Sequence, residues 1–254
     1  MNWRLLFILL LGLPGTASLW SAEPVVIEKK PVLVMVHGAW AGGWHMRKVA
    51  PLLEARGYQV YTPTLSGLGE RYHTATPAIG LDVHIADIVN FILFEDLHDV
   101  ILLGHSYGGM VITGVADRIP ERIARLVYLD AFLPENGESL MDLRKGGSLP
   151  IAQMTRDGFI LPTWVKPDKP FPRDVPHPLK TFTDPIVLKN PAAAKIPGTY
   201  ILTVEKGRAP EEDEFYPAAE RAKARGWPVI TMEADHVPYW RKPAETAELL
   251  LGLP

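Results

Sequence analysis

The stretch ILLGHSYGGMV, residues Ile101 to Val111, places a serine between glycines directly after a run of branched apolar residues. The apolar run is typical of a strand that is buried on both faces, and the segment MVITGVADR that follows predicts a helix. GHSYG fits the pattern G-x-S-x-G, whose glycines permit a sharp strand-to-helix turn that lifts a serine hydroxyl above a sheet. The stretch therefore predicts that Ser106 is a nucleophile, the alternative being a serine that only caps the helix.

Short apolar runs like the one before Ser106 recur along the 254 residues, and amphipathic segments lie between them. The runs begin at Pro31, Tyr58, Asp99, Ile123, Gly198 and Trp227, and the helical patterns cover 44–56, 81–95, 110–118, 212–225 and 243–251. Alternation of this kind is typical of a mostly parallel sheet with helices on both faces. The length and the 47% hydrophobic content fit one domain with one sizeable core, so we expect a single α/β domain over residues 23–254.

One stretch, residues 134–197, interrupts this alternation. It is rich in Pro, Gly and Lys and shows little periodicity, and long segments of this kind inside a compact domain are usually binding elements or covers. Because apolar runs flank it on both sides, we expect an inserted lid over the carboxyl edge of the sheet. Its aromatic residues Phe159, Trp164 and Phe171 either contact a hydrophobic substrate or pack the lid onto the core.

The first 20 residues, MNWRLLFILLLGLPGTASLW, carry one basic residue and then an apolar stretch from Leu5 to Leu13. This stretch is shorter than the roughly 20 residues that span a bilayer, which favours a signal peptide of about residues 1–22 over a membrane anchor. We therefore expect a secreted or periplasmic protein without membrane integration after cleavage.

Charge and cysteine content exclude several function classes. The 26 Lys and Arg residues against 29 Asp and Glu residues give a net charge of -3 without any basic block, so nucleic acid is not an expected partner. The chain has no cysteine, which excludes thiol catalysis and cysteine metal sites. A small neutral or weakly charged molecule fits this composition better, whereas the sequence leaves the oligomeric state open.

A serine hydroxyl needs a base that takes its proton. Among the eight histidines, His236 follows the last predicted strand and precedes the last helix, which fits the order Ser, acid, His that accompanies G-x-S-x-G. We expect His37 and His105 to be structural or to line the pocket. The other five are expected at the surface or in loops and lack the spacing of a metal site: His45, His73, His84, His98 and His177.

The third member of such a triad is a buried carboxylate that orients the histidine. Glu205 ends the run GTYILTV, and Asp130 ends the run LVYLD that comes before it. Both would lie at the carboxyl edge of the sheet. We favour Glu205, because it fits the chain order most directly, and we keep Asp130 as the alternative.

The loop HGAWAGGW, which follows the first predicted strand, supplies small residues near the same edge. Its geometry would let the backbone N–H of Ala39 join that of Tyr107 as an oxyanion hole. A phosphate-binding loop is the alternative, but the segment lacks both G-x-G-x-x-G and a G-K-[ST] ending.

Four segments together resemble the α/β-hydrolase superfamily: VHGAWAGGW, GHSYGGMVI, LVYLDAFLPENGES and the late ADH. Within it they look like the branch of plant methyl esterases of the salicylate-binding type, hydroxynitrile lyases and bacterial carboxylesterases such as pyrethroid hydrolases. The resemblance covers roughly residues 31–253. It implies an α/β-hydrolase fold with an inserted lid, and it places Glu205 where this branch usually has an aspartate.

The resemblance implies a serine esterase that cleaves carboxylic esters of hydrophobic small molecules through an acyl-enzyme, without a cofactor or metal. The lyases of the branch use a threonine and a lysine where this chain has Gly38 and Val237, so lyase chemistry is disfavoured. Two alternatives stay open. One is a ligand-binding protein of the same fold, and the other is an enzyme acting on amides, lactones or carbon–carbon bonds.

Overall fold

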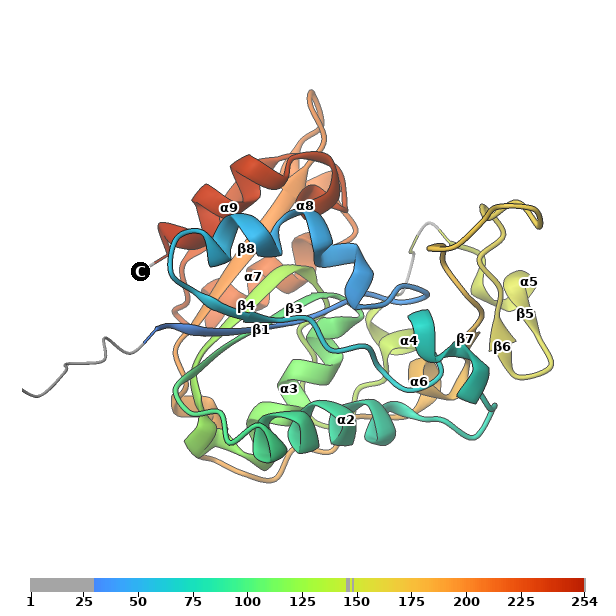
Figure 1. The fold of residues 1–254 in the computed structure, drawn as a ribbon, viewed down its shortest axis with the longest axis horizontal. Coiled ribbons are helices and arrows are strands. Elements are labelled where there is room, and N and C mark those ends of the chain that lie inside the picture. The colour runs from blue at the N-terminus through green and yellow to red at the C-terminus, as the bar shows by residue number, and fades with distance from the viewer. Residues whose placement is uncertain (1–29, 145–146, 148, 254) are drawn as a thin grey trace, which may run out of the picture.

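A sheet of six parallel strands forms the centre of the computed structural model, which describes residues 30–144, 147 and 149–253 (Figure 1). Each strand begins within one of the six apolar runs, so the predicted α/β fold is confirmed. In their order across the sheet the strands are β2 (Gln59–Tyr61), β1 (Val32–Val36), β3 (Val100–Ser106), β4 (Ile123–Ala131), β8 (Gly198–Val204) and β9 (Val229–Glu233).

Helices cover both faces of this sheet (Figure 1). One face carries α2 (Leu81–Phe94), α3 (Gly108–Arg118) and α7 (Tyr216–Ala224), and the other carries α1 (Ala50–Glu54), α8 (Pro238–Arg241) and α9 (Pro243–Leu251). Strand β1 shows why: Val34 and Val36 pack into the first cluster of apolar side chains, whereas Leu33 and Met35 pack into the second. Successive side chains of a strand point to opposite faces, so an entirely apolar strand needs a cover on each.

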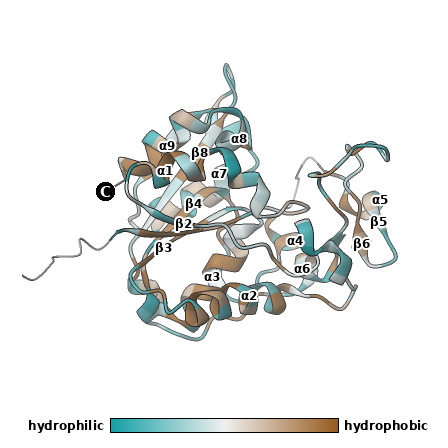
Figure 2. Ribbon diagram, viewed as in Figure 1, coloured by the Kyte–Doolittle hydropathy of each residue, from teal (hydrophilic) through white to brown (hydrophobic). Residues whose placement is uncertain are grey.

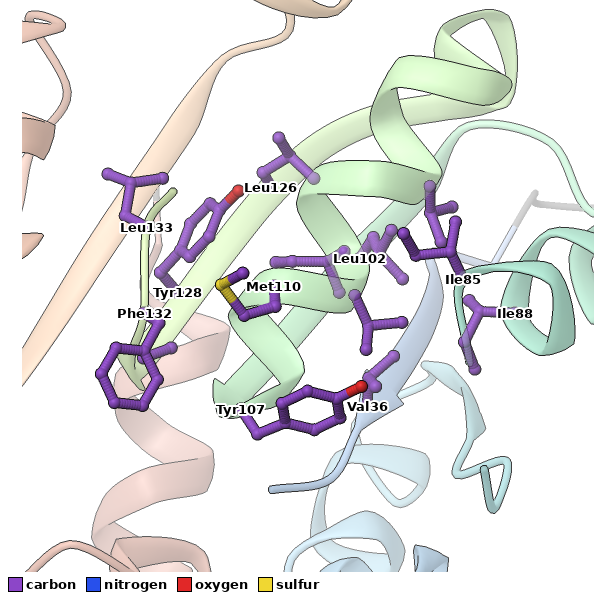
Figure 3. Packing of buried hydrophobic residues seen from close by; sticks show 14 of the residues in the cluster. Val36, Ile85, Ile88, Leu102, Tyr107, Met110, Leu126, Tyr128, Phe132 and Leu133 are labelled. Carbon is purple, nitrogen blue, oxygen red and sulfur yellow. The ribbon is translucent and has the colours of Figure 1, made fainter. Parts of the chain in front are cut away.

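The apolar side chains gather between the sheet and its helices (Figure 2). On the face of α3, Met110 lies between the strand residues Leu102 and Tyr128, and Ile85 of α2 packs beside them (Figure 3). All four are buried. This packing fixes α3 against β3 and thereby fixes the turn that joins them.

Two helices begin later than the sequence pattern predicts. The segment 44–56 divides into a 3-10 helix, η1 (Gly43–Lys48), and α1, and the pattern over 212–225 becomes a helix only at Tyr216. Both α1 and α7 carry a proline in their first turn, Pro51 and Pro217. Proline lacks the N–H that a helix interior requires, so a helix starts there and does not continue through.

Residues 134–197, called the insertion below, connect β4 to β8, and most of them gather at one end of the sheet (Figure 1). The last of them run back past the carboxyl end of α3, where Asp117 accepts from the N–H groups of Lys189 and Asn190. Its elements are short: α4 (Leu140–Leu143), α5 (Ile151–Met154), β5 (Thr155–Arg156), β6 (Phe159–Ile160), β7 (His177–Pro178), α6 (Lys180–Thr183) and η4 (Ala193–Lys195). Strands β5, β6 and β7 form a small antiparallel sheet. Three further 3-10 helices lie outside the insertion: η2 (Gly69–Thr74), η3 (Pro120–Arg122) and η5 (Pro210–Glu212).

The predicted signal peptide, residues 1–22, lies outside the described residues. Within the part of the chain that the structure describes, no helix has both the length and the apolar character needed to cross a membrane.

Candidate active site

The order of the strands reverses between β1 and β3, because the chain goes from β1 outward to β2 and then returns to β3 on the other side. In open parallel sheets the loops that leave the carboxyl ends at such a reversal diverge and open a crevice. The loop after β1 contains Ala39, and Ser106 is the last residue of β3, at the turn into α3. The topology therefore brings both to the mouth of one crevice.

The turn at Ser106 is sharp and strained. Ser106 has φ 54, a value rare for a residue with a side chain, and it joins the end of β3 to α3. A Cβ on Gly104 would lie 2.6 Å from the carbonyl oxygen of Gly108, and a Cβ on Gly108 would lie 2.6 Å from that of Val36. Both glycines are thus required by close backbone approach. Ser106 is half-buried, whereas His105 and Tyr107 on either side of it are buried. Ser106 is thus the residue of this turn that is most accessible from the crevice, which it lines.

His236 lies in the loop between β9 and α8, and its ring is anchored by Asp130 near the end of β4. Its Nδ1 lies 2.6 Å from Oδ2 of Asp130, and Oδ1 of the same carboxylate accepts a hydrogen bond of 2.9 Å from the backbone N–H of Thr203. The Asp130 side chain is only 2% exposed. A carboxylate held in this way fixes the tautomer of the imidazole and leaves Nε2 as the nitrogen that can exchange a proton.

The structure brings the alternative carboxylate to His236 and not the favoured one. Glu205 follows β8, is exposed, and starts a turn in which its carbonyl accepts from the N–H of Arg208. It lines the rim of the same crevice. Because β4 and β8 are neighbours, Asp130 and Glu205 lie near the same edge, but only Asp130 is buried against the imidazole. The preference for Glu205 is therefore corrected in favour of Asp130 as the partner of His236.

Two aromatic rings pack beside the His236 ring. Phe215 is stacked on it at 4.8 Å between ring centroids, and His105 lies at 4.5 Å. Burial lowers the pKa of His236, but the hydrogen bond and the charge of Asp130 raise it by more, so the pKa lies above its ordinary value of 6.5. The side chain is still 43% exposed, so it is open to the crevice. The site thus holds a base whose protonated form is stabilised.

The loop after β1 passes very close to the turn at Ser106. A Cβ on Gly38 would lie 2.9 Å from Nδ1 of His105 and 3.0 Å from the Cβ of Ser106, so only glycine fits there. Ala39, which follows, and Tyr107, which follows the serine, both line the crevice. The structure therefore brings the two residues predicted to hold an oxyanion to the same place as Ser106 and His236.

A pocket of about 590 Å³ opens over these residues. Side chains of the insertion form part of its wall, and they are Leu140, Arg144, Leu149, Trp164, Asp174 and Phe182. Of the three aromatic residues expected either to contact a substrate or to pack the lid onto the core, Trp164 is the one that lines this pocket. Phe171 is 57% exposed and contacts Tyr72, and Phe159 belongs to β6.

A chain of hydrogen bonds leads from the backbone of His236 toward the insertion. Nε2 of His105 donates to the carbonyl of His236 at 2.6 Å, so Nδ1 accepts from the hydroxyl of Tyr239 at 3.0 Å. The same hydroxyl lies 3.3 Å from Nδ1 of His45, whose Nε2 is 3.6 Å from Asp174. Burial lowers the pKa of His105 well below its ordinary value. His105 is therefore neutral and positions the loop that carries His236.

Two histidines expected at the surface or in loops are fully buried, so that expectation was wrong for His84 and His177. Nε2 of His84 donates to the carbonyl of Ser66 at 2.9 Å, and Nδ1 accepts from the hydroxyl of Tyr107 at 2.8 Å. His177 binds Trp40 and Thr181. The sequence gives no periodic signal for His177, because it is buried by segments far away in the chain. His84 does carry a signal, since it lies three residues after Leu81 and four before Ile88, on the buried face of α2.

No cluster of three or more His, Cys, Asp or Glu side chains suited to a metal ion occurs among residues 30–144, 147 and 149–253. The polar groups of the site are instead arranged around a hydroxyl, an imidazole and a carboxylate.

Residues 33–249 match the model of the alpha/beta hydrolase family. The chain belongs to this family. The resemblance seen in the sequence is thereby confirmed at the level of the family and of the fold.

Named relatives fall in the branch that the sequence resembles. The chain is 39% identical to the carbendazim hydrolyzing esterase of Nocardioides sp. strain SG-4G over 87% of this chain and 98% of the relative. It is 26% identical to the pyrethroid hydrolase of Sphingobium wenxiniae, over 86% of this chain and 85% of that one. Among solved structures, an extracellular alpha/beta-hydrolase from a Paenibacillus species superposes with a TM-score of 0.73, at 26% identity over 87% of this chain and 98% of the other.

Proposed function

We propose that this member of the alpha/beta hydrolase family is a serine esterase that cleaves carboxylic esters of hydrophobic small molecules. The observation that carries the proposal is the anchored imidazole of His236, bound at 2.6 Å to a buried carboxylate and sharing a pocket with a serine on a strained turn. The relatives named above, an esterase acting on carbendazim and a hydrolase acting on pyrethroids, support ester hydrolysis.

In the proposed reaction the hydroxyl of Ser106 attacks the ester carbonyl while Nε2 of His236 takes its proton. The backbone N–H groups of Ala39 and Tyr107 donate to the oxyanion that forms. His236 then gives the proton to the leaving alcohol, and Asp130 stabilises the imidazolium between these two steps. Water, activated by His236, attacks the acyl-enzyme, and its cleavage releases the acid and restores Ser106.

The wall of the pocket supports a hydrophobic substrate. Phe132, Phe182 and Phe215 line it together with Trp164 and the side chains of Leu140 and Leu149. Aromatic and aliphatic walls of this kind bind the apolar body of a small ligand, and a few polar groups orient it. The insertion supplies much of this wall, so we propose that it acts as a lid of the site.

We also propose that the chain is exported. The apolar segment from Leu5 to Leu13 supports a signal peptide, and one solved relative is named as extracellular. Mass spectrometry of the mature protein tests this proposal, because an intact Met1 would contradict cleavage.

Turnover of a panel of p-nitrophenyl esters by the wild type and by Ser106→Ala tests the esterase. We expect kcat to fall by at least about 10⁴-fold in the variant, since the nucleophile is lost. A fluorophosphonate probe should label only the wild type. Binding of an ester without turnover or labelling would indicate a ligand-binding protein, and turnover of amides or lactones alone would indicate a different bond.

A further inference from the structure

Trp40 connects the loop after β1 to the insertion. Its backbone has φ 62, a left-handed conformation that is uncommon for a residue with a side chain, and the residue is buried. It directly follows Ala39, the proposed donor of the oxyanion hole. The peptide that carries the N–H of Trp40 is joined through the Cα of Ala39 to the peptide that carries the N–H of Ala39, so holding the first restricts the orientations open to the second.

Three hydrogen bonds hold Trp40, and every partner belongs to the insertion. Its backbone N–H donates to Nδ1 of His177 at 3.1 Å, its carbonyl accepts from the N–H of Val175 at 2.9 Å, and its indole Nε1 donates to the carbonyl of Ile160 at 2.9 Å. The indole also makes edge-on contacts with the rings of Trp164 and Phe182 at 5.0 and 5.7 Å. The insertion thus supplies all three of these hydrogen bonds to Trp40 and both of these ring contacts.

The hydrogen bonds of His177 fix its tautomer. Because Nδ1 accepts from Trp40, Nε2 carries the proton and donates to the hydroxyl of Thr181 at 2.7 Å, which in turn donates to the carbonyl of Pro178 at 2.8 Å. The ring is fully buried on β7, so water does not compete for the bond to Trp40. Protonation of Nδ1 would break that bond, and burial keeps the pKa of His177 well below its ordinary value.

The same bond decides which N–H of the loop is free to face a substrate. The N–H of Trp40 is occupied by His177, so it cannot donate into the pocket. An acceptor at this position also stabilises the left-handed backbone, a strained conformation that persists only where its surroundings enforce it. Without the acceptor, the Ala39–Trp40 peptide can rotate, and the adjoining peptide that carries the N–H of Ala39 can rotate with it.

We propose that His177 is a positioning residue, through which the insertion holds the backbone of Trp40 and so keeps the N–H of Ala39 directed at the oxyanion. The inference rests on the proposed esterase function. It gives the insertion a role in the chemical step, in addition to forming the wall of the pocket.

His177→Leu and His177→Asn test the proposal by steady-state kinetics with a p-nitrophenyl ester. Leucine removes the acceptor, and we expect kcat to fall about 10- to 100-fold with KM changed by less than about threefold, because only the transition state carries the oxyanion. Asparagine can place its amide oxygen near the position of Nδ1 and should restore most of kcat. Thr155→Val is the matched control, because Thr155 is in the same small sheet and its hydroxyl donates to the carbonyl of Ile151 in α5, whereas the hydrogen bonds of Trp40 are made by other residues.

Inhibition by 2,2,2-trifluoroacetophenone separates positioning from a loss of structure. Attack of Ser106 on this ketone forms a tetrahedral oxyanion, so its inhibition constant should rise in His177→Leu by about the same factor as kcat/KM falls. A folded leucine variant with wild-type kcat, or one in which only KM rises, overturns the proposal.

Two further outcomes have distinct meanings. If the wild type hydrolyses no ester, the proposed function fails. If His177→Leu does not fold, the rate of hydrogen exchange at the backbone amide of Trp40 is measured in the wild type. An amide that exchanges only when the whole protein unfolds supports the bond to His177. An amide that exchanges as fast as one in an exposed loop overturns the proposal.

Discussion

Asp130 accepts hydrogen bonds from two fixed donors, the backbone N–H of Thr203 and Nδ1 of His236. In Asp130→Asn the amide oxygen would stay with Thr203, and the amide N–H would face Nδ1. His236 would then carry its proton on Nε2 and could not accept one from Ser106. We expect kcat for ester hydrolysis to fall by about 10³- to 10⁴-fold.

Glu205→Gln is the matched control for this change, since Glu205 lies exposed on the rim of the same pocket. Steady-state kinetics should show kcat within about threefold of the wild type, because Asp130 and not Glu205 is the carboxylate bound to His236. A collapse of kcat in Glu205→Gln with little effect in Asp130→Asn would contradict the pairing of His236 with Asp130.

The raised pKa of His236 predicts the acid limb of the pH profile. The base must be neutral, so kcat/KM should fall about tenfold per pH unit below that pKa, and the midpoint should lie above 6.5. In Asp130→Asn the hydrogen bond and charge that stabilise the imidazolium are lost, so the midpoint should move to lower pH. Measuring kcat/KM from pH 5 to 9 for both proteins checks this. An unchanged midpoint would show that another group controls the limb.

At the scale of the element, the strand-to-helix turn depends on two glycines whose missing side chains leave room for backbone. Gly104→Ala and Gly108→Ala would each place a Cβ 2.6 Å from a carbonyl oxygen. We expect each to lower the free energy of unfolding by about 1–3 kcal/mol, because backbone atoms on both sides must move. Denaturant unfolding measures the change. Gly252→Ala is the control, since its nearest contact is 3.5 Å, and a loss equal to that of Gly104→Ala would contradict the explanation.

The elements of the sheet could be predicted from the sequence because their pattern is local. A strand covered on both faces is apolar without alternation, and all six runs of this kind became strands. Helix α2 begins at Leu81, as its apolar repeat predicts. The starts of α1 and α7 differ from the prediction. In both segments the apolar pattern begins several residues before a proline, whereas the α-helix begins only next to that proline.

At the scale of the whole molecule, five buried or mostly buried histidines have lowered pKa values. The pKa of His37 is about 3, those of His45 and His84 are about 4, and those of His105 and His177 are well below normal. Burial is the main cause at each position, since it disfavours the charged ring. Below about pH 6.5 the unfolded chain therefore binds protons that the folded chain does not. The free energy of unfolding decreases as the pH is lowered. His236 acts oppositely, adding stability as pH falls through its raised pKa.

We expect the free energy of unfolding to decrease steeply between pH 6 and 5, with each of these histidines contributing about 1.4 kcal/mol per pH unit. His84→Gln removes one of the titrating groups and should reduce the slope by about that amount. Denaturant unfolding at a series of pH values measures both slopes. A slope that stays the same in His84→Gln would mean that His84 binds a proton equally in both states.

The sequence by itself determined the parallel sheet and the turn at Ser106, because each depends on residues that are close in the chain. The order of the elements along the chain pointed to His236. Only the tertiary structure decided between Asp130 and Glu205. Both end apolar runs, and they differ in whether the neighbouring strand and the last loop enclose the carboxylate. The burial of His177 and the hydrogen bonds between the insertion and Trp40 depend in the same way on contacts between distant segments. Such contacts leave no periodic trace in a sequence, since they are set by how the elements pack and not by how each one forms.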